Sequence, residues 1–259
     1  MNSREEKLRA FGRLLDILDE LREACPWDRK QTNESLRPNT IEETYELSDA
    51  LLHDDTSNIK KELGDVLLHI IFYCKIADEK EQFDIADVCN SLCDKLIFRH
   101  PHVYKDTTNT LNADEVLENW EKIKQKEKDG NKTVLSGVPT ALPSLIKADR
   151  IQEKASNVGF DWEKKEDVWE KVREEIAEVE AEMKKENGDT EGEMGDLLFS
   201  LVNAARLYKV NPDTALERTN QKFIKRFNYV EATAKANGQT LSDLSLEEMD
   251  DLWNKAKNI

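Results

Sequence analysis

Two segments in the second half of the chain carry acidic residues at a spacing that suits binding of a divalent cation. Glu175 and Glu178 lie three residues apart, as do Glu193 and Asp196. Side chains three residues apart on an α-helix lie on the same face, about one turn apart. Because the intervening loop is short, the two helices are expected to be antiparallel neighbours, with the four carboxylates converging across their interface.

The first half of the chain contains the same arrangement, with Glu43, Glu46, Glu62 and Asp65. Four carboxylates at close range repel one another and raise one another's pKa unless a cation neutralises them. Ligation by oxygen alone favours Mg²⁺ or Mn²⁺ over zinc or copper. The spacing therefore predicts a Mg²⁺ or Mn²⁺ site in the second half and a second candidate site in the first.

An isolated acidic pair of this kind is usually a solvated helix face, since Asp and Glu make up 54 of the 259 residues. Asp65 and Asp196 are more specific, because each precedes an apolar run in which an unpaired charge is disfavoured. Each also follows a glycine, Gly64 or Gly195, that costs about 1 kcal/mol relative to alanine in a helix. Close helix packing is the structural explanation for these glycines, and the pattern as a whole favours a functional site.

Two basic residues in the second half of the chain are suited to binding phosphate oxygens. Lys222 and Arg226 are four residues apart, so they lie on one helix face, where a point charge and a planar fork complement each other. Alone, such a pair is usually surface charge, but it recurs in both halves of the chain. Lys171, one turn before the acidic pair, is a weaker phosphate candidate, and the neighbouring Glu174 is placed among the substrate contacts.

Aromatic and histidine residues are less informative. Trp253 either stacks on a base or packs in the core, and the sequence leaves both interpretations open. His69 is expected to be a histidine of the core or its rim. The motif RHPHVY at 99–104 has no partner at metal-ligand spacing and is interpreted as a structural turn.

The two halves of the chain match each other in several elements that occur in the same order, which indicates a tandem duplication. Glycine and proline cluster at 126–145, and proline removes donors that a continuous helix requires. We therefore expect two domains, 1–137 and 138–259. The matched pairs are 41–47 with 174–180, 61–71 with 192–202, 26–28 with 159–162, Lys95 and Arg99 with Lys222 and Arg226, and Trp120 with Trp253.

Apolar residues recur at helical spacing and no convincing period-2 run is present, which predicts an all-α fold. Each repeat is interpreted as about four helices followed by a helix that carries a tryptophan. A helical bundle, completed within the chain or by a second subunit, is the natural package. Asn39 and Thr40 are expected to cap the helix that bears the first acidic pair. The expected helices include 5–24, 41–53, 58–79, 84–99 and 170–186.

The composition limits the class of protein further. A net charge of −16 argues against non-specific binding of nucleic acid, which requires basic residues to neutralise phosphates. No stretch approaches the uncharged length of a membrane span. The four cysteines form no CxxC pair, and Cys89 and Cys93 are spaced for packing on one helix face. A reduced, cytoplasmic compartment is therefore expected.

In combination these motifs resemble the MazG family of nucleoside triphosphate pyrophosphohydrolases. The resemblance rests on CPWDRKQTNESL at 25–36, on EExxE…ExxD in both halves and on RHPHVY, and it covers essentially the whole chain. It implies an all-α NTP-pyrophosphatase fold, a homodimer, and Mg²⁺ held by the four acids. It also implies hydrolysis of ribo- and deoxyribonucleoside triphosphates between the α and β phosphates, which yields a monophosphate and pyrophosphate.

The resemblance also implies roles for individual residues, because catalysis in two-domain members is ascribed mainly to the second domain. In-line attack by water, with one glutamate as general base, is the expected mechanism. The stretch before Glu193 reads NGDTEG where such proteins are usually basic, so Lys184 or Lys185 would have to replace the missing lysine. The metal ligands would be Glu175, Glu178, Glu193 and Asp196, and the residues placed in catalysis or substrate contact are Glu175, Lys222, Arg226 and Trp253.

Two other interpretations are open at this point. A narrow-specificity relative, such as a dCTP/dUTP or phosphoribosyl-ATP pyrophosphatase, would use the same carboxylates and differ in its base or sugar contacts. A non-catalytic helical interaction module would carry its acids on the surface and show no stabilisation by nucleotide with Mg²⁺. A first repeat kept for dimer assembly is compatible with the leading interpretation.

Overall fold

The computed structural model describes residues 1–104, 123 and 133–257, and these residues form helices without any strand. The predicted all-α fold is confirmed. Within this part of the chain, no helix is long and apolar enough to cross a membrane. The chain divides into two compact units, Met1–Leu111 and Asn112–Ile259. The domain boundary near residue 137 stays a prediction.

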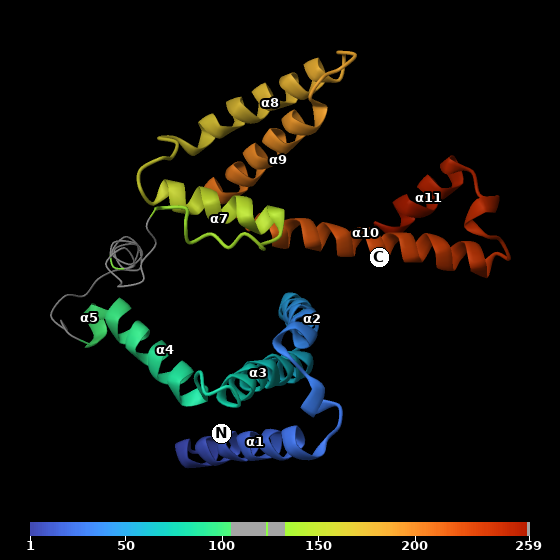
Figure 1. The fold of residues 1–259 in the computed structure, drawn as a ribbon. Coiled ribbons are helices and arrows are strands. Elements are labelled where there is room, and N and C mark those ends of the chain that lie inside the picture. Colours follow the sequence, from blue (N-terminus) through green and yellow to red (C-terminus); the bar gives the residue numbers. More distant parts are fainter. Residues whose placement is uncertain (105–122, 124–132, 258–259) are drawn as a thin grey trace. The chain divides into compact units, whose positions relative to one another are not determined.

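The first unit is built around two long helices, α2 and α3, that pack side by side (Figure 1). Its core is a small cluster of buried apolar side chains from α1, α2 and α3, including Leu18, Leu36 and Ile71. The elements are α1 (Arg4–Ala24), η1 (Asp28–Lys30), α2 (Asn33–Leu52), α3 (Thr56–Asp78), α4 (Ile85–Arg99) and α5 (Pro101–Tyr104).

Helix α2 begins earlier than the sequence predicts, so the expectation that Asn39 and Thr40 cap it was wrong. The N-cap is Thr32, whose hydroxyl accepts a hydrogen bond from the Ser35 amide at 3.2 Å, while the Ser35 hydroxyl accepts from the Thr32 amide at 2.9 Å. This reciprocal pair satisfies two amides that a helix end leaves open. Pro38 is accommodated inside the helix. Glu43 and Glu46 therefore lie in mid-helix, away from its positive end.

The second unit contains the corresponding pair of helices, α8 and α9, with α7 packed against α9 (Figure 1). Val168 and Val172 of α8 and Ala204 of α9 form the buried core of this pair. The elements are α7 (Ser144–Ser156), η2 (Lys165–Asp167), α8 (Val168–Glu182), α9 (Thr190–Leu207), α10 (Pro212–Ala236), η3 (Leu241–Asp243) and α11 (Leu246–Ala256).

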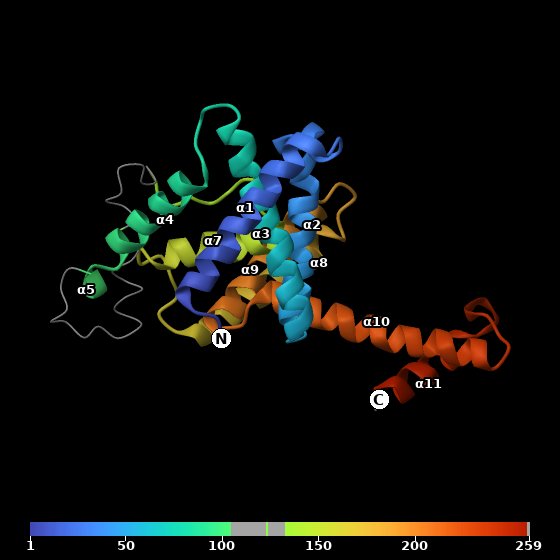
Figure 2. The ribbon, with the colours of Figure 1, turned by 90° about the horizontal axis from the view of Figure 1, so that it is seen from below.

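Helix α10 extends well beyond the α7–α9 group, and α11 folds back against its far part (Figures 1 and 2). Its counterpart α4 is shorter and ends at Arg99, where His100 and Pro101 follow, as the sequence indicates. The expected tryptophan helix of the second repeat is α11. Trp120, its counterpart in the first repeat, lies outside the described residues.

Three local expectations differ from the structure. The helix expected over 170–186 ends at Glu182, whose side chain accepts a hydrogen bond from the Asp189 amide in the turn that follows. Close packing does not explain Gly64 or Gly195, because a Cβ at either position would meet no described atom within 4 Å. The cysteines at positions 89 and 93 are exposed on α4 instead of packed on one face.

Candidate functional site

The second unit brings acids of α8 and α9 together as the spacing predicts. Glu175 of α8 and Glu193 and Asp196 of α9 each offer a carboxylate oxygen, and these oxygens all lie within 4.8 Å of one another. Glu178 is exposed and lies next to this group. Desolvation, followed by the negative charges of Glu175 and Glu193, raises the pKa of Glu178. The four predicted acids therefore form one electrostatic cluster, which we call the second acidic cluster.

Glu175 is buried because it lies on the apolar face of its helix. The other buried residues of α8 include Val168, Val172 and Val179, at the spacing that defines one helical stripe. Only 5% of Glu175 is exposed, and its Oε2 atom has no hydrogen-bond partner among the described residues. A buried carboxylate oxygen without a donor is costly. A divalent cation that binds oxygen ligands would satisfy this atom, so the residues fit a metal.

Lys171 provides a positive charge at the edge of the second acidic cluster. Its Nζ atom lies 2.8 Å from Glu175 Oε1 and 2.9 Å from Glu174 Oε1. The hydrogen bond to Glu175, and then that to Glu174, raises the pKa of the Lys171 ammonium. The weaker phosphate candidate of the sequence thus lies beside the acids. Lys185, one of the two proposed substitutes for a loop lysine, pairs with Glu182.

The first unit contains a corresponding first acidic cluster. One oxygen from each of Glu43, Glu46 and Glu62 lies within 4.8 Å of the others. Desolvation, followed by the charges of Asp65, Glu46 and Glu62, raises the pKa of Glu43. Here the buried acid is Glu62 of α3, and its Oε2 atom lacks a partner in the described structure. In the repeat alignment, Glu62 corresponds to Glu193 and not to Glu175, so the two clusters are buried differently.

A lysine that sequence reasoning missed lies within the first acidic cluster. Lys61 Nζ is 2.8 Å from Glu62 Oε1, 3.7 Å from Asp65 and 3.8 Å from Glu46. The aligned position in the second repeat is Gly192. The first cluster is therefore partly neutralised by its own side chain, whereas the lysine of the second cluster approaches from α8. The repeat alignment could have revealed this lysine, because Lys61 aligns with Gly192 directly before the aligned glutamates Glu62 and Glu193.

His69 belongs to the core of the first unit, as expected. It is buried, and its Nδ1 lies 3.0 Å from the Thr40 hydroxyl, which also lies 2.5 Å from the Tyr73 hydroxyl. Burial lowers the pKa of His69, although the charge of Asp65 opposes this effect. The histidine is therefore part of a buried hydrogen-bonded network in which burial favours its neutral form.

The remaining predicted contacts lie on α10 and α11. The Arg226 guanidinium lies over the Trp253 ring at 5.7 Å, and the Trp253 ring packs on Phe223 at 4.9 Å between centroids. Lys222 is exposed on the same helix. None of the three predicted substrate contacts lines the pocket beside the second acidic cluster. The structure brings Arg226 and Trp253 together, and their contact with substrate stays a prediction.

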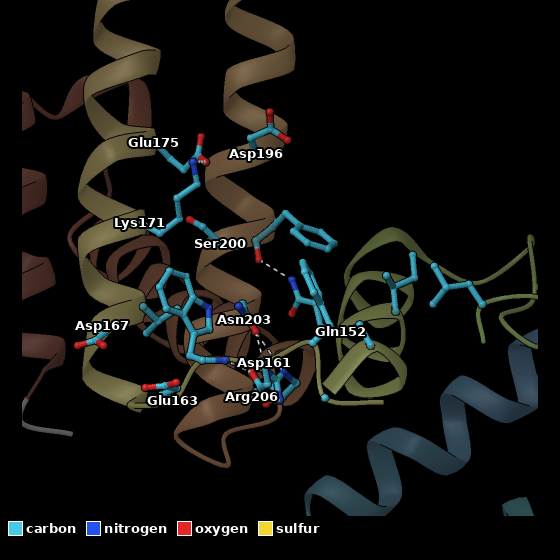
Figure 3. A pocket seen from close by; sticks show the side chains of 18 residues that line it. Gln152, Asp161, Glu163, Asp167, Lys171, Glu175, Asp196, Ser200, Asn203 and Arg206 are labelled. Atoms are coloured by element: carbon cyan, nitrogen blue, oxygen red, sulfur yellow. Dashed lines mark hydrogen bonds and ion pairs between the residues drawn. The ribbon is translucent and has the colours of Figure 1, made fainter. Parts of the chain in front are cut away.

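A pocket of about 830 Å³ opens beside the second acidic cluster. Lys171, Glu175 and Asp196 lie at one end of it, and Asn203 and Arg206 lie further along (Figure 3). This volume is within the range of small-molecule sites. Sequence reasoning missed the pocket, although a polar stripe at 196, 200 and 203 on α9 and the GFDW segment at 159–162 marked it.

An ion pair holds the segment before α8 against α9 at the far end of the pocket. The Arg206 guanidinium donates to both carboxylate oxygens of Asp161, at 2.5 and 3.0 Å. Burial is the largest single effect on Asp161 and opposes its ionisation, but the hydrogen bonds from Arg206, the hydrogen bond from the Trp162 amide and the charge of Arg206 together lower the pKa of Asp161. The wall of the pocket that contains 159–162 is therefore fixed by a bidentate contact.

Comparison with known proteins gives consistent matches. The model of the MazG nucleotide pyrophosphohydrolase domain matches residues 31–104 and 163–231, and each segment contains one acidic cluster. The nucleoside triphosphate pyrophosphohydrolase/pyrophosphatase MazG of Thermotoga maritima is 44% identical over 250 residues, which is 95% of each chain. The nucleoside triphosphate pyrophosphohydrolase of Escherichia coli K12 is 41% identical over 95% of this chain and 97% of its own. YabN of Bacillus subtilis is 46% identical over 98% of this chain and 53% of its own length.

Proposed function

The chain belongs to the MazG nucleotide pyrophosphohydrolase family, and from this premise we propose that it hydrolyses ribo- and deoxyribonucleoside triphosphates to monophosphates and pyrophosphate. The metal in this proposal is Mg²⁺, with Mn²⁺ as a substitute. The observation that carries the proposal is the second acidic cluster, which lies at one end of a ligand-sized pocket. Glu175 of this cluster has a buried oxygen without a partner among the described residues.

Glu175, Glu178, Glu193 and Asp196 would hold the metal. When bound, Mg²⁺ supplies positive charge that neutralises phosphate oxygens and lowers the pKa of water. Lys171 is placed to exchange its contact with Glu175 for a contact with a phosphate oxygen. One of the glutamates would act as general base instead of as a metal ligand and would accept the proton of the attacking water. Positioning and electrostatic stabilisation then supply most of the rate acceleration.

A homodimer is the simplest arrangement in which Lys222, Arg226 and Trp253 contact a substrate, because they would then contribute to the site of a second copy of the chain. Helix α10 extends away from the α7–α9 group and carries exposed apolar side chains, among them Phe223 and Ile224. Exposed apolar residues on one face of a helix indicate an interaction surface. We therefore include a homodimer in the proposal, in which α10 and α11 of one protomer complete the substrate contacts of the other.

A mixing experiment tests this arrangement. Glu175→Gln and Arg226→Ala protomers are each expected to be strongly impaired alone. They should regain activity after being unfolded and refolded together, because mixed dimers contain one site with both residues intact. Random association would restore about a quarter of the wild-type rate. Absence of any recovery, with dimers confirmed by light scattering, would show that each site is built within one chain.

The reaction itself is tested with eight ribo- and deoxyribonucleoside triphosphates, with and without Mg²⁺. The expected products of ATP are AMP and pyrophosphate, and chelation of the metal should stop the reaction. ADP and orthophosphate as primary products would refute the proposed reaction. The panel also separates the broad activity from that of a narrow-specificity pyrophosphatase, for which a single base would dominate.

A further inference from the structure

The pocket of the second unit extends past the acids into a region that the phosphate chemistry does not use. Gln152 of α7 lines this region and is only 6% exposed. Its Nε2 atom donates a hydrogen bond to the Phe199 carbonyl oxygen at 2.8 Å. Its Oε1 atom is buried and has no partner among the described residues. This atom is a polar group of the pocket wall that lacks a ligand.

The polarity of Gln152 is fixed by its neighbour. A backbone carbonyl oxygen can only accept, so the amide nitrogen of Gln152 must face Phe199 and the oxygen must be the free atom. A buried acceptor without a donor destabilises the folded chain. The position therefore selects a ligand that presents an N–H or O–H group.

Asn203 of α9 lines the same pocket, and its available group is a hydrogen-bond donor, whereas that of Gln152 is an acceptor. Its Oδ1 atom accepts hydrogen bonds from Arg206 Nε at 3.1 Å and from Nη2 at 2.8 Å. Arg206 is itself held by Asp161. This chain of contacts fixes the orientation of the Asn203 amide and leaves its Nδ2 atom as a donor. The pocket thus offers one fixed acceptor and one fixed donor.

The distance to the acids and the aromatic wall suit a nucleoside. Asn203 lies seven residues after Asp196 on α9, which is about 10 Å along the helix axis. Trp162 and Phe160 line the same pocket. The flat face of an aromatic side chain stacks on any nucleobase. The pocket therefore has an aromatic lining, and Gln152 and Asn203 lie away from Glu175 and Asp196 (Figure 3).

We propose that this region is the nucleobase subsite, in which Gln152 Oε1 accepts an N–H of the base, Asn203 Nδ2 donates to the adjacent ring atom, and Trp162 stacks on the ring. The inference rests on the proposed function, since it assumes a nucleoside triphosphate as substrate. Adenine, cytosine, guanine and uracil each carry an adjacent donor and acceptor on their Watson–Crick edge. A single acceptor and donor can therefore serve several bases, which agrees with action on many nucleotides.

The test uses nucleosides without phosphate in the presence of a chelator, so that neither metal nor turnover contributes. Binding of adenosine and of purine riboside, which lacks the 6-amino group, is titrated to the full-length protein by ligand-observed NMR. Adenosine should bind about 3- to 10-fold more tightly, the size of one net hydrogen bond. This comparison needs no substitution, so it is unaffected by any folding defect.

A matched pair of variants assigns the preference to one residue. Gln152→Leu should bind both nucleosides with equal affinity, whereas Gln239→Leu, at an exposed position in the turn after α10, should retain the wild-type preference. Equal binding of the two nucleosides to the wild type, or a preference that survives in Gln152→Leu, would overturn the subsite. So would undetectable adenosine binding to a protein that hydrolyses ATP. Adenosine binding without release of pyrophosphate from ATP would instead refute the proposed reaction and leave the subsite standing.

Discussion

The two units should contribute unequally to hydrolysis, and the aligned pair Glu175 and Glu43 allows a matched test. Glu175→Gln retains the size of the side chain and part of its hydrogen bonding but removes the charge that the metal requires. Glu43→Gln makes the same change in the first acidic cluster. We expect the first variant to lose activity and the second to retain most of it.

The expected loss follows from the position of Glu175 beside the other carboxylates. Two unit charges 4 Å apart interact by about 1 kcal/mol in bulk water, so a dication loses about 2 kcal/mol when one carboxylate at that distance is neutralised. This corresponds to about 30-fold in the metal binding constant. Glu175 is only 5% exposed, and burial lowers the effective dielectric constant. The figure is therefore a lower bound, and at saturating Mg²⁺ a further loss in kcat is expected.

The assay measures pyrophosphate release from ATP over a range of Mg²⁺ concentrations, after circular dichroism has shown that both variants remain helical. Glu175→Gln should require at least about 30-fold more Mg²⁺ for half-maximal activity. Lys61 contacts three acids of the first unit, whereas Lys171 contacts only Glu175 among the four acids of the second cluster. A cation therefore meets more competition in the first unit, and Glu43→Gln should shift this value little. Loss of activity in Glu43→Gln alone, or half activity in both variants, would refute the assignment of the active site to the second unit.

Three further outcomes are expected. Arg226→Ala and Lys222→Ala should each lower kcat/KM by about 30- to 300-fold without loss of helicity, and wild-type rates would show that the pair is surface charge. Burial lowers the pKa of His69, so the unfolded chain binds the proton more readily than the folded chain. The free energy of unfolding should therefore fall as pH drops below about 6.5. Urea titrations at several pH values should show a weaker dependence in His69→Gln. Arg22 of α1 donates hydrogen bonds to both carboxylate oxygens of Glu79, at 2.8 and 2.5 Å, and Arg22→Ala should lower the free energy of unfolding by about 1–3 kcal/mol. The hydrogen bond from Arg22 lowers the pKa of Glu79, so the stability difference between the wild type and Arg22→Ala should be largest above pH 4.5. Urea titrations at lower pH should show a smaller difference. A difference that does not change with pH would refute the contribution of the Arg22–Glu79 ion pair.

The sequence predicts the fold class and the convergence of the acids because both depend on regular spacing. Helical periodicity places Glu175 and Glu178 on one face, and a short loop places Glu193 and Asp196 opposite them. The repeat then predicts the same convergence in the other half of the chain. These properties belong to single helices and their immediate neighbours, which spacing determines.

The burial of the acids and the lining of the pocket depend on which helices pack against each other. The spacing of residues along the sequence does not determine that packing. The aligned acids do not share their burial, since Glu62 is the buried acid of the first cluster and Glu175 that of the second. The role of Gln152 requires that α7 lie against α9 near Phe199. The early start of α2 was missed because Asn39 and Thr40 were taken as the cap of this helix, while the actual cap at Thr32 lies upstream.

The uncompensated oxygen of Glu175 also bears on how long the protein persists in a cell. A buried carboxylate oxygen without a donor destabilises the second unit, and a cation that binds this oxygen stabilises the folded state alone. Proteases act on transiently opened molecules in proportion to their population when reclosing is fast. The unit should therefore be degraded faster when divalent metal is scarce, so that metal supply controls the amount of enzyme as well as its rate.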